Sequence, residues 1–122
     1  MTLQAQTLAD RYVSVWNQAD KVIRREQIQA LWAVDGAHYV KTREARGYRE
    51  LEERVAGSYE KNVKANGNLF RSVADAQLLR DVVAFHWEMI APATGEVLAT
   101  GLEFLHVDQQ GKILIDYQFI IA

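Results

Sequence analysis

Glu103 stands in the middle of an apolar stretch, and its carboxyl group is the first in this sequence that could do chemistry. Its neighbours are Leu102, Phe104 and Leu105. A carboxylate in such a stretch lies either in a pocket, where burial changes its protonation, or on an outward strand face in contact with water. The strand pattern leaves both interpretations open.

Histidine also suits proton transfer near neutral pH, and the chain has 3. His86 and His106 have no third ligand at a recognisable spacing, so no metal site is predicted. The absence of cysteine excludes disulfides, thiolate nucleophiles and cysteine-based metal sites. The 7 glycines form no phosphate-binding loop, and no serine lies in a G-x-S-x-G elbow. We therefore expect no metal ion and no cofactor.

A chain of 122 residues is close to the commonest domain size, so we expect one domain over 1–122. The 14 basic and 16 acidic residues leave a net charge of −2 and form no basic stripe, which argues against a nucleic-acid partner. Apolar runs such as 113–115 are too short to span a membrane. The first residues lack the charged and apolar regions of a secretion signal, so a cytoplasmic location is expected.

The first half of the chain has the periodicity of three amphipathic helices. Their apolar stripes are Leu8, Tyr12, Val15, Trp16 and Ala19; then Ile28, Leu31 and Trp32; then Leu51, Val55, Tyr59 and Val63. Asp20 is placed to cap the second helix, and Asp35-Gly36 to end it. A short strand over 37–42 and a turn at Arg46-Gly47 are expected before the third helix, which should end at Asn66-Gly67-Asn68.

The second half changes to the alternating pattern of strands. Four are expected, at 69–79, 81–90, 97–107 and 112–121, and the residues between them favour turns. Helices followed by hairpin-connected strands imply an α+β fold, with the helices on one face of an antiparallel sheet.

Alternation along the last two strands sorts their residues into two faces. One face carries Ala99, Gly101, Glu103 and Leu105, with Leu114, Asp116, Gln118 and Ile120. The other carries Leu98, Leu102, Phe104, Tyr117 and Phe119. Neither face is plainly polar, so one should meet the helices and the other needs a second cover. A second copy of the chain is the simplest cover, and a homodimer is expected.

Three stretches resemble known sequences in order and at matching spacing: 11–20, 30–40 followed by Arg46-Gly47, and 103–113 with its Asp-x-x-Gly turn. The first looks like the first-helix segment of Δ5-3-ketosteroid isomerases. Over essentially its whole length the chain resembles the nuclear transport factor 2-like (SnoaL-like) superfamily. The resemblance implies a cone, in which a curved antiparallel sheet has three N-terminal helices packed on its concave face.

The functional positions of the isomerases are only partly matched by residues of this sequence. Tyr12 falls where the isomerases keep the tyrosine that hydrogen-bonds the substrate oxygen. Glu103 falls where they keep a carboxylic acid held neutral by its apolar surroundings, which donates a second hydrogen bond to that oxygen. Their basic aspartate aligns with Val40, which cannot take a proton, so the usual steroid isomerisation is not expected. His38, on the same strand side as Val40, and Asp116 are the other groups that could supply a base.

The resemblance therefore predicts four catalytic residues, Tyr12, His38, Glu103 and Asp116, in an otherwise apolar cone. The residues expected to bind the substrate are Trp16, Val40, Phe85, Trp87, Met89, Gln118 and Ile120. Apolar walls with few converging polar groups are typical of small-molecule pockets. The expected ligand is a small apolar molecule of the polyketide or steroid kind. The expected reaction is of the isomerase, cyclase or hydrolase type, with an oxyanion stabilised by Tyr12 and Glu103.

Three of the polar candidates also have a purely structural interpretation. Tyr12 can be a core tyrosine whose hydroxyl is satisfied, and His38 a hydrogen-bonded core histidine. Asp116 can form an ion pair with Arg71 on a neighbouring strand.

Two further alternatives concern function. Glu103 and Asp116 could be a carboxylate pair like that of the cone-shaped epoxide hydrolases, although those enzymes have an arginine where Gly101 stands. The whole chain could also be a non-catalytic module that binds a ligand or another protein. An open cavity of about 300 Å³ or more would favour ligand binding, and a filled one would favour the module.

Overall fold

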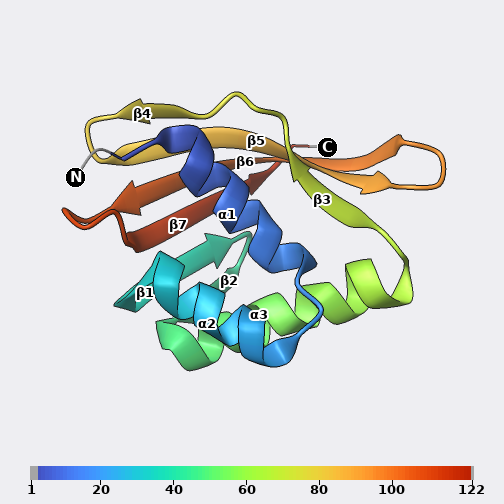
Figure 1. Ribbon diagram of the computed structural model, residues 1–122, viewed down its shortest axis with the longest axis horizontal. Coiled ribbons are helices and arrows are strands. Elements are labelled where there is room, and N and C mark those ends of the chain that lie inside the picture. The colour runs from blue at the N-terminus through green and yellow to red at the C-terminus, as the bar shows by residue number, and fades with distance from the viewer. Residues whose placement is uncertain (1–2, 122) are drawn as a thin grey trace.

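The computed structural model describes residues 3–121, in which helices cover one face of a 7-stranded sheet (Figure 1). The helices are α1 (Ala5–Asn17), α2 (Lys21–Leu31) and α3 (Gly47–Ser58), which continues as the π-helical segment η1 (Tyr59–Ala65). The strands are β1 (Trp32–Val40), β2 (Arg43–Arg46), β3 (Leu69–Ser72), β4 (Gln77–Leu79), β5 (Val82–Ala91), β6 (Glu96–Val107) and β7 (Ile113–Ile120). Their order is β2-β1-β7-β6-β5-β3, with β4 also paired to β5. Within residues 3–121 no helix is both long and apolar enough to cross a membrane.

The first two helices form where their apolar stripes predict them. On α1, the stripe residues Leu8, Tyr12, Val15 and Trp16 are buried. The helix ends at Asn17, whose side chain bonds both the backbone N–H and the carbonyl of Phe70, at 2.9 and 2.7 Å. This pair ties the end of α1 to β3. Asp20 caps α2 as predicted, accepting hydrogen bonds from the first two N–H groups beyond Lys21.

The second helix ends earlier than predicted, and Asp35-Gly36 is not a break between elements. α2 stops at Leu31, and Trp32 already begins β1 with a fully buried indole. A Cβ on Gly36 would lie 2.7 Å from Cδ1 of Trp32, so this glycine makes room for the indole inside the strand. The strand is irregular here, since its register with β7 shifts between Trp32 and Ala37.

Two other boundaries were wrong. The strand expected over 37–42 ends at Val40, and a turn at Lys41, with φ 52°, leads into β2, which the sequence pattern did not predict. β2 is short and mostly exposed, so it carries no apolar signal. The strand expected over 69–79 is split into β3 and β4. The side chain of Asp75 binds the backbone N–H of His86 at 2.9 Å and so fixes the break without a glycine or proline.

The third helix ends as predicted at Asn66-Gly67-Asn68, where Gly67 has φ 69°. Its last turns are π-helical rather than α-helical. A π-helical stretch is wider, and such stretches are common at functional sites. Residues 54, 57, 58, 61 and 62 from α3 and η1 all face the same internal cavity.

The sheet is mixed, whereas the sequence pattern predicted an antiparallel one. β1 runs parallel to β7, and the remaining pairs are antiparallel. The parallel pair places His38 opposite Asp116 and Val40 opposite Gln118. Turn signals in the sequence predict pairs of neighbouring strands joined by hairpins, and such pairs are antiparallel. β1 and β7 are far apart in the chain, so no turn signal predicts that they pair.

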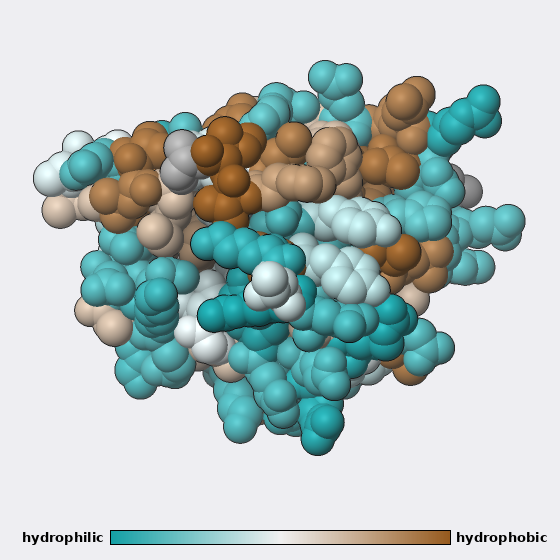
Figure 2. All heavy atoms as spheres, turned by 180° about the vertical axis from the view of Figure 1, so that it is seen from behind, coloured by the Kyte–Doolittle hydropathy of each residue, from teal (hydrophilic) through white to brown (hydrophobic). Residues whose placement is uncertain are grey.

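The two faces of β6 and β7 sort as predicted. Glu103 and Asp116 are fully buried under the helices, whereas Tyr117, Phe119 and Leu98 on the outer face are 43, 54 and 41% exposed. Phe104 and Phe119 pack edge to face on that outer side. Seen from behind, apolar side chains gather in the upper part of the molecule, where Figure 1 places β5 and β6 (Figure 2).

Candidate functional site

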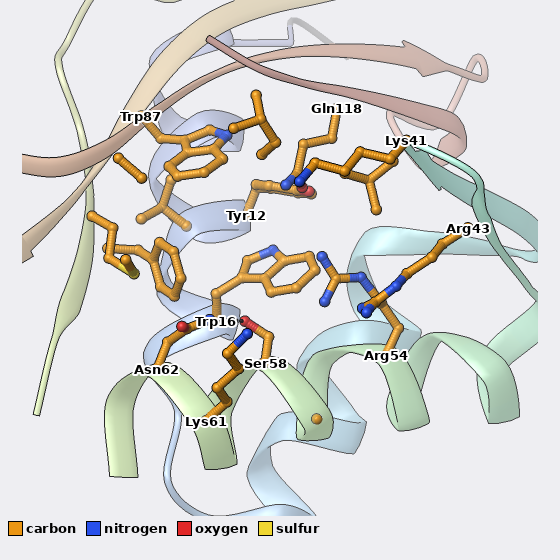
Figure 3. Close-up of a pocket in the computed structure, with 17 residues that line it drawn as sticks. Tyr12, Trp16, Lys41, Arg43, Arg54, Ser58, Lys61, Asn62, Trp87 and Gln118 are labelled. Atoms are coloured by element: carbon orange, nitrogen blue, oxygen red, sulfur yellow. Dashed lines mark hydrogen bonds between the residues drawn. The ribbon is translucent and has the colours of Figure 1, made fainter. Parts of the chain in front are cut away.

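A cavity of about 310 Å³ lies between α1, the α3–η1 helix and the inner face of the sheet (Figure 3). Of the residues expected to bind a substrate, those that line it are Trp16, Val40, Trp87, Met89, Gln118 and Ile120. Phe85 lies in the core instead, with its ring centroid 5.6 Å from that of Tyr12 in an edge-on contact. Tyr12 is the predicted catalytic residue that reaches the cavity wall.

The four predicted catalytic residues come together in one buried network behind that wall. The Tyr12 hydroxyl lies 2.6 Å from Oδ2 of Asp116 and 3.1 Å from Oε2 of Glu103. Nδ1 of His38 lies 2.6 Å from the same Oδ2 of Asp116. The side chains come from α1, β1, β6 and β7, and none is more than 2% exposed. The alternative partner of Asp116, Arg71, instead pairs with Glu88 at 2.9 Å.

Trp87 sets the direction of the hydrogen bonds in this network. Its Nε1–H donates to Oε1 of Glu103 at 2.8 Å, so Oε1 is an acceptor and Oε2 is the oxygen that can carry a proton. A hydroxyl has one hydrogen, and that of Tyr12 belongs to its shorter contact, with Asp116. Oε2 of Glu103 then faces the Tyr12 hydroxyl oxygen at 3.1 Å, and the carboxyl group of Glu103 is also hydrogen-bonded to that of Asp116. His38 bonds the same Oδ2 of Asp116 that Tyr12 does.

The pKa shifts in the network favour a proton on Glu103 rather than on Asp116. Burial raises the pKa of Glu103 well above its ordinary value, and the nearby charge of Asp116 raises it further. Burial alone would raise the pKa of Asp116, but attraction to His38 and hydrogen bonds from its neighbours outweigh it and lower that pKa. Burial, with the charges of Asp116 and Glu103, also raises the pKa of Tyr12. The raised pKa values of Glu103 and Tyr12 favour their protonated forms, and the lowered pKa of Asp116 favours its ionised form.

Gly101 makes the bond between Trp87 and Glu103 possible. It is paired with Trp87 across β5 and β6, and a Cβ at position 101 would overlap the indole ring. The absent side chain lets the indole lie flat over β6 with Nε1 directed at the carboxyl group two residues along. This close approach explains the glycine at the position where the cone-shaped epoxide hydrolases are expected to carry arginine.

His38, Glu103 and Asp116 are also the group of described residues whose ligand atoms lie close enough to hold a metal ion, within 4.8 Å of one another. Their chemistry favours the hydrogen-bond network instead. The raised pKa of Glu103 favours its protonated form, and its two oxygens already bond Trp87 and Tyr12. A cation would have to displace those bonds in a buried site.

The sequence pattern missed the cationic side of the cavity. Lys41, Arg43, Arg54 and Lys61 line it, with the polar residues Ser58 and Asn62. The guanidinium of Arg54 lies 5.0 Å from the ring centroid of Trp16. Arg54 follows the stripe residue Leu51 by three positions, so a charged residue beside an apolar stripe was the signal available in the sequence.

No family profile matches the sequence, and no curated protein matches it either. Similarity appears among solved structures. A candidate isomerase of the SnoaL-like family from Agrobacterium tumefaciens superposes with a TM-score of 0.86 at 21% identity, over 98% of this chain and 100% of that one.

Two other solved structures share the architecture. A SnoaL-like protein of unknown function from Burkholderia thailandensis gives a TM-score of 0.72 at 15% identity, over the full length of both chains (100% and 100%). A candidate polyketide cyclase from Sinorhizobium meliloti gives 0.69 at 12% identity, over 96% of this chain and 100% of that one. With its helices over a curved mixed sheet and a cavity between them, the chain has the SnoaL-like, nuclear transport factor 2-like fold.

Proposed function

We propose that this chain binds a small carbonyl compound in its cavity and stabilises negative charge on the carbonyl oxygen with the hydroxyl of Tyr12. Enolate stabilisation of this kind serves both isomerase- and cyclase-type reactions. The observation that carries the proposal is the position of Tyr12, which is part of the cavity wall and whose hydroxyl is hydrogen-bonded to two buried carboxyl groups.

In this proposal Glu103 acts through Tyr12 rather than on the substrate. The sequence-based expectation was that both residues donate to the oxygen directly, but the carboxyl group of Glu103 is fully buried behind the cavity wall. A proton on its Oε2 would be donated to the Tyr12 oxygen 3.1 Å away, and accepting that bond would make the Tyr12 O–H a stronger donor. When a substrate oxygen arrives, Tyr12 turns its hydrogen from Asp116 to that oxygen. Glu103 is then a positioning residue and Tyr12 the catalytic one.

The size and walls of the cavity support a small ligand. About 310 Å³ is near the lower end of the range for ligand sites, and the aromatic rings of Trp16, Trp87 and Phe70 line it. The names of the similar structures, a candidate isomerase and a candidate polyketide cyclase, fit the same chemistry. A homodimer is the functional unit in this proposal, since the outer sheet face leaves Tyr117 and Phe119 exposed.

One observation favours a second candidate, a ligand-binding protein without turnover. The position expected for a general base holds Val40, and among the described residues the cavity lining contains neither a carboxylate nor an imidazole. Asp116 and His38 are near, but neither lines the cavity. Without a base in its cavity, the protein could bind the ligand and stabilise its enolate but could not abstract a proton. Exchange of α-protons of a bound ketone for deuterium separates the two candidates, since only an enzyme catalyses it.

Binding of 2-naphthol, a compact mimic of an enolate, tests the role of Tyr12. A hydrogen bond to a charged or strongly polar oxygen contributes roughly 1.5–3 kcal/mol, so Tyr12→Phe should weaken binding about tenfold or more. Glu103→Gln keeps a donor toward Tyr12 and should weaken it less. Tyr117→Phe removes a hydroxyl from the outer face and is the matched control. Equal affinities of the wild type and Tyr12→Phe in titration calorimetry would overturn the proposal.

A further inference from the structure

Four cationic side chains reach the cavity from three elements. Lys41 and Arg43 come from the turn into β2 and from β2 itself, Arg54 from α3 and Lys61 from η1. Figure 3 shows Arg43 and Arg54 together beside Trp16, and Lys41 extending toward Gln118 and Tyr12. Among the described lining residues there is no aspartate or glutamate to balance them. The cavity therefore has a positively charged side.

These cations are not used in ion pairs within residues 3–121. The arginines and lysines that do form such pairs are Arg25, Arg46, Lys64 and Arg71. Beyond the effect of burial, the charge of Arg43 acts on Arg54 as a like-charge repulsion, since it lowers the pKa of that guanidinium. An anionic group bound in the cavity would remove this repulsion.

Arg54 is the cavity-lining cation with a buried donor atom that has no partner among residues 3–121. It is half-buried, and its Nε atom is fully buried with no hydrogen-bond partner in the described part of the chain. Its contact with the Trp16 ring holds the guanidinium in one orientation. Burial, together with the charge of Arg43, lowers its pKa, although the charges of the buried network act in the opposite direction. A fixed, partly desolvated guanidinium presents the planar donor fork that matches a carboxylate.

Trp16 carries a second unpaired donor at the same wall. Its Nε1 is buried without a hydrogen-bond partner among the described residues, and its ring lies between Tyr12 and Arg54 in Figure 3. Buried donors are nearly always satisfied in folded proteins. Both unpaired nitrogens, Nε1 of Trp16 and Nε of Arg54, are buried, and they leave this wall of the cavity with more donors than acceptors.

We propose that the ligand of this cavity is a small aromatic or alicyclic acid, whose carboxylate binds Arg54 with help from Arg43 and whose ring packs on Trp16 and Trp87. This deepens the proposed function and rests on it, since it names the class of carbonyl compound that Tyr12 would contact. The purely apolar, steroid-like ligand expected from the resemblance does not use the charged side of the cavity.

A pair of nearly isosteric probes tests the charge directly. 2-Naphthoate and 2-naphthamide differ in charge but hardly in shape. Calorimetry at low salt should show that the wild type binds the acid about tenfold or more tightly than the amide. Arg54→Gln should bring the two affinities together, and Arg43→Gln should narrow the gap. Arg49→Gln, on the same helix but outside the cavity lining, should keep the full gap.

Every outcome bears on the proposal. Equal affinities of acid and amide in the wild type overturn it, and so does a gap that survives both Arg54→Gln and Arg43→Gln. The Arg43 variant removes an exposed residue, so a folding defect in the Arg54 variant does not block the test. The difference in affinity between acid and amide can depend on Arg54 while Tyr12→Phe leaves the affinity for 2-naphthol unchanged. That result would support the anion site and contradict the proposed role of Tyr12. If none of these compounds binds, both proposals fail.

Discussion

Replacing Glu103 by glutamine removes the titrating group from the buried network and keeps the shape of the side chain. The amide oxygen can still accept from Trp87, and the amide N–H can still donate to Tyr12. Wild type and Glu103→Gln should therefore differ mainly in how stability depends on pH. The raised pKa of Glu103 gives this difference a definite sign.

The folded wild type holds a proton on Glu103 at pH values where the unfolded chain has lost it. Above the ordinary value of 4.5, each pH unit therefore lowers the free energy of unfolding by about 1.4 kcal/mol, until the folded pKa is reached. The unfolding entropy of 122 residues is about 0.26 kcal/mol/K, so one pH unit corresponds to a fall of about 5 °C in Tm. Glu103→Gln should lack this fall.

Urea denaturation between pH 4 and 8, followed by tryptophan fluorescence, measures the effect. The informative quantity is the wild-type free energy of unfolding minus that of Glu103→Gln, because other titrating groups cancel in it. This difference should be largest below the ordinary pKa of glutamate and decrease as pH rises. Asp116→Asn is a control of opposite sign, since a lowered pKa contributes stability that is present at higher pH and lost on acidification.

Parallel stability curves for wild type and Glu103→Gln across this range would refute the reasoning. They would mean that Glu103 is ionised in the folded protein. Glu103 would then have no proton to donate to Tyr12 and could not strengthen it as a donor.

Two further predictions concern packing. Leu102→Asp places a charge in the centre of the outer sheet face and should convert a dimer into monomer or aggregate in sedimentation experiments. The control substitution Val22→Asp on α2 should leave the dimer intact. A monomeric wild type at micromolar concentration would contradict the homodimer. Gly101→Ala forces the Trp87 indole away from β6 and should lower the free energy of unfolding by about 1–3 kcal/mol in urea denaturation. Gly57→Ala, whose Cβ would meet no atom within 4 Å, should not be destabilising, and equal effects of the two substitutions would contradict the close packing.

Local patterns predicted the elements whose signals are local. The apolar stripes of α1, α2 and α3, the Asp20 cap and the turns between the long strands depend on residues a few positions apart. The same patterns misjudged Gly36, because its role depends on the indole of Trp32 and not on backbone flexibility. They also missed β2, whose four residues are almost entirely exposed.

The buried network was predicted by resemblance and not by spacing. Tyr12 and Asp116 are 104 residues apart, and only the parallel pairing of β1 with β7 brings His38 to the same carboxylate. The cations were missed for a related reason. Lys41, Arg43 and Lys61 stand in exposed or charged segments that look like solvated surface, and the fold alone turns them toward one cavity.

The central position of β7 has a consequence for how the chain folds. It is the last strand in the chain, yet it lies between β1 and β6 in the sheet. Until β7 has left the ribosome, β1 and β6 each present an unpaired edge, and the two halves of the sheet are not joined. Open edges of this kind attract other strands, so partial chains should depend on chaperones during synthesis. Because β7 also brings Asp116, the Tyr12 hydroxyl acquires the shorter of its two hydrogen bonds only once β7 has joined the sheet.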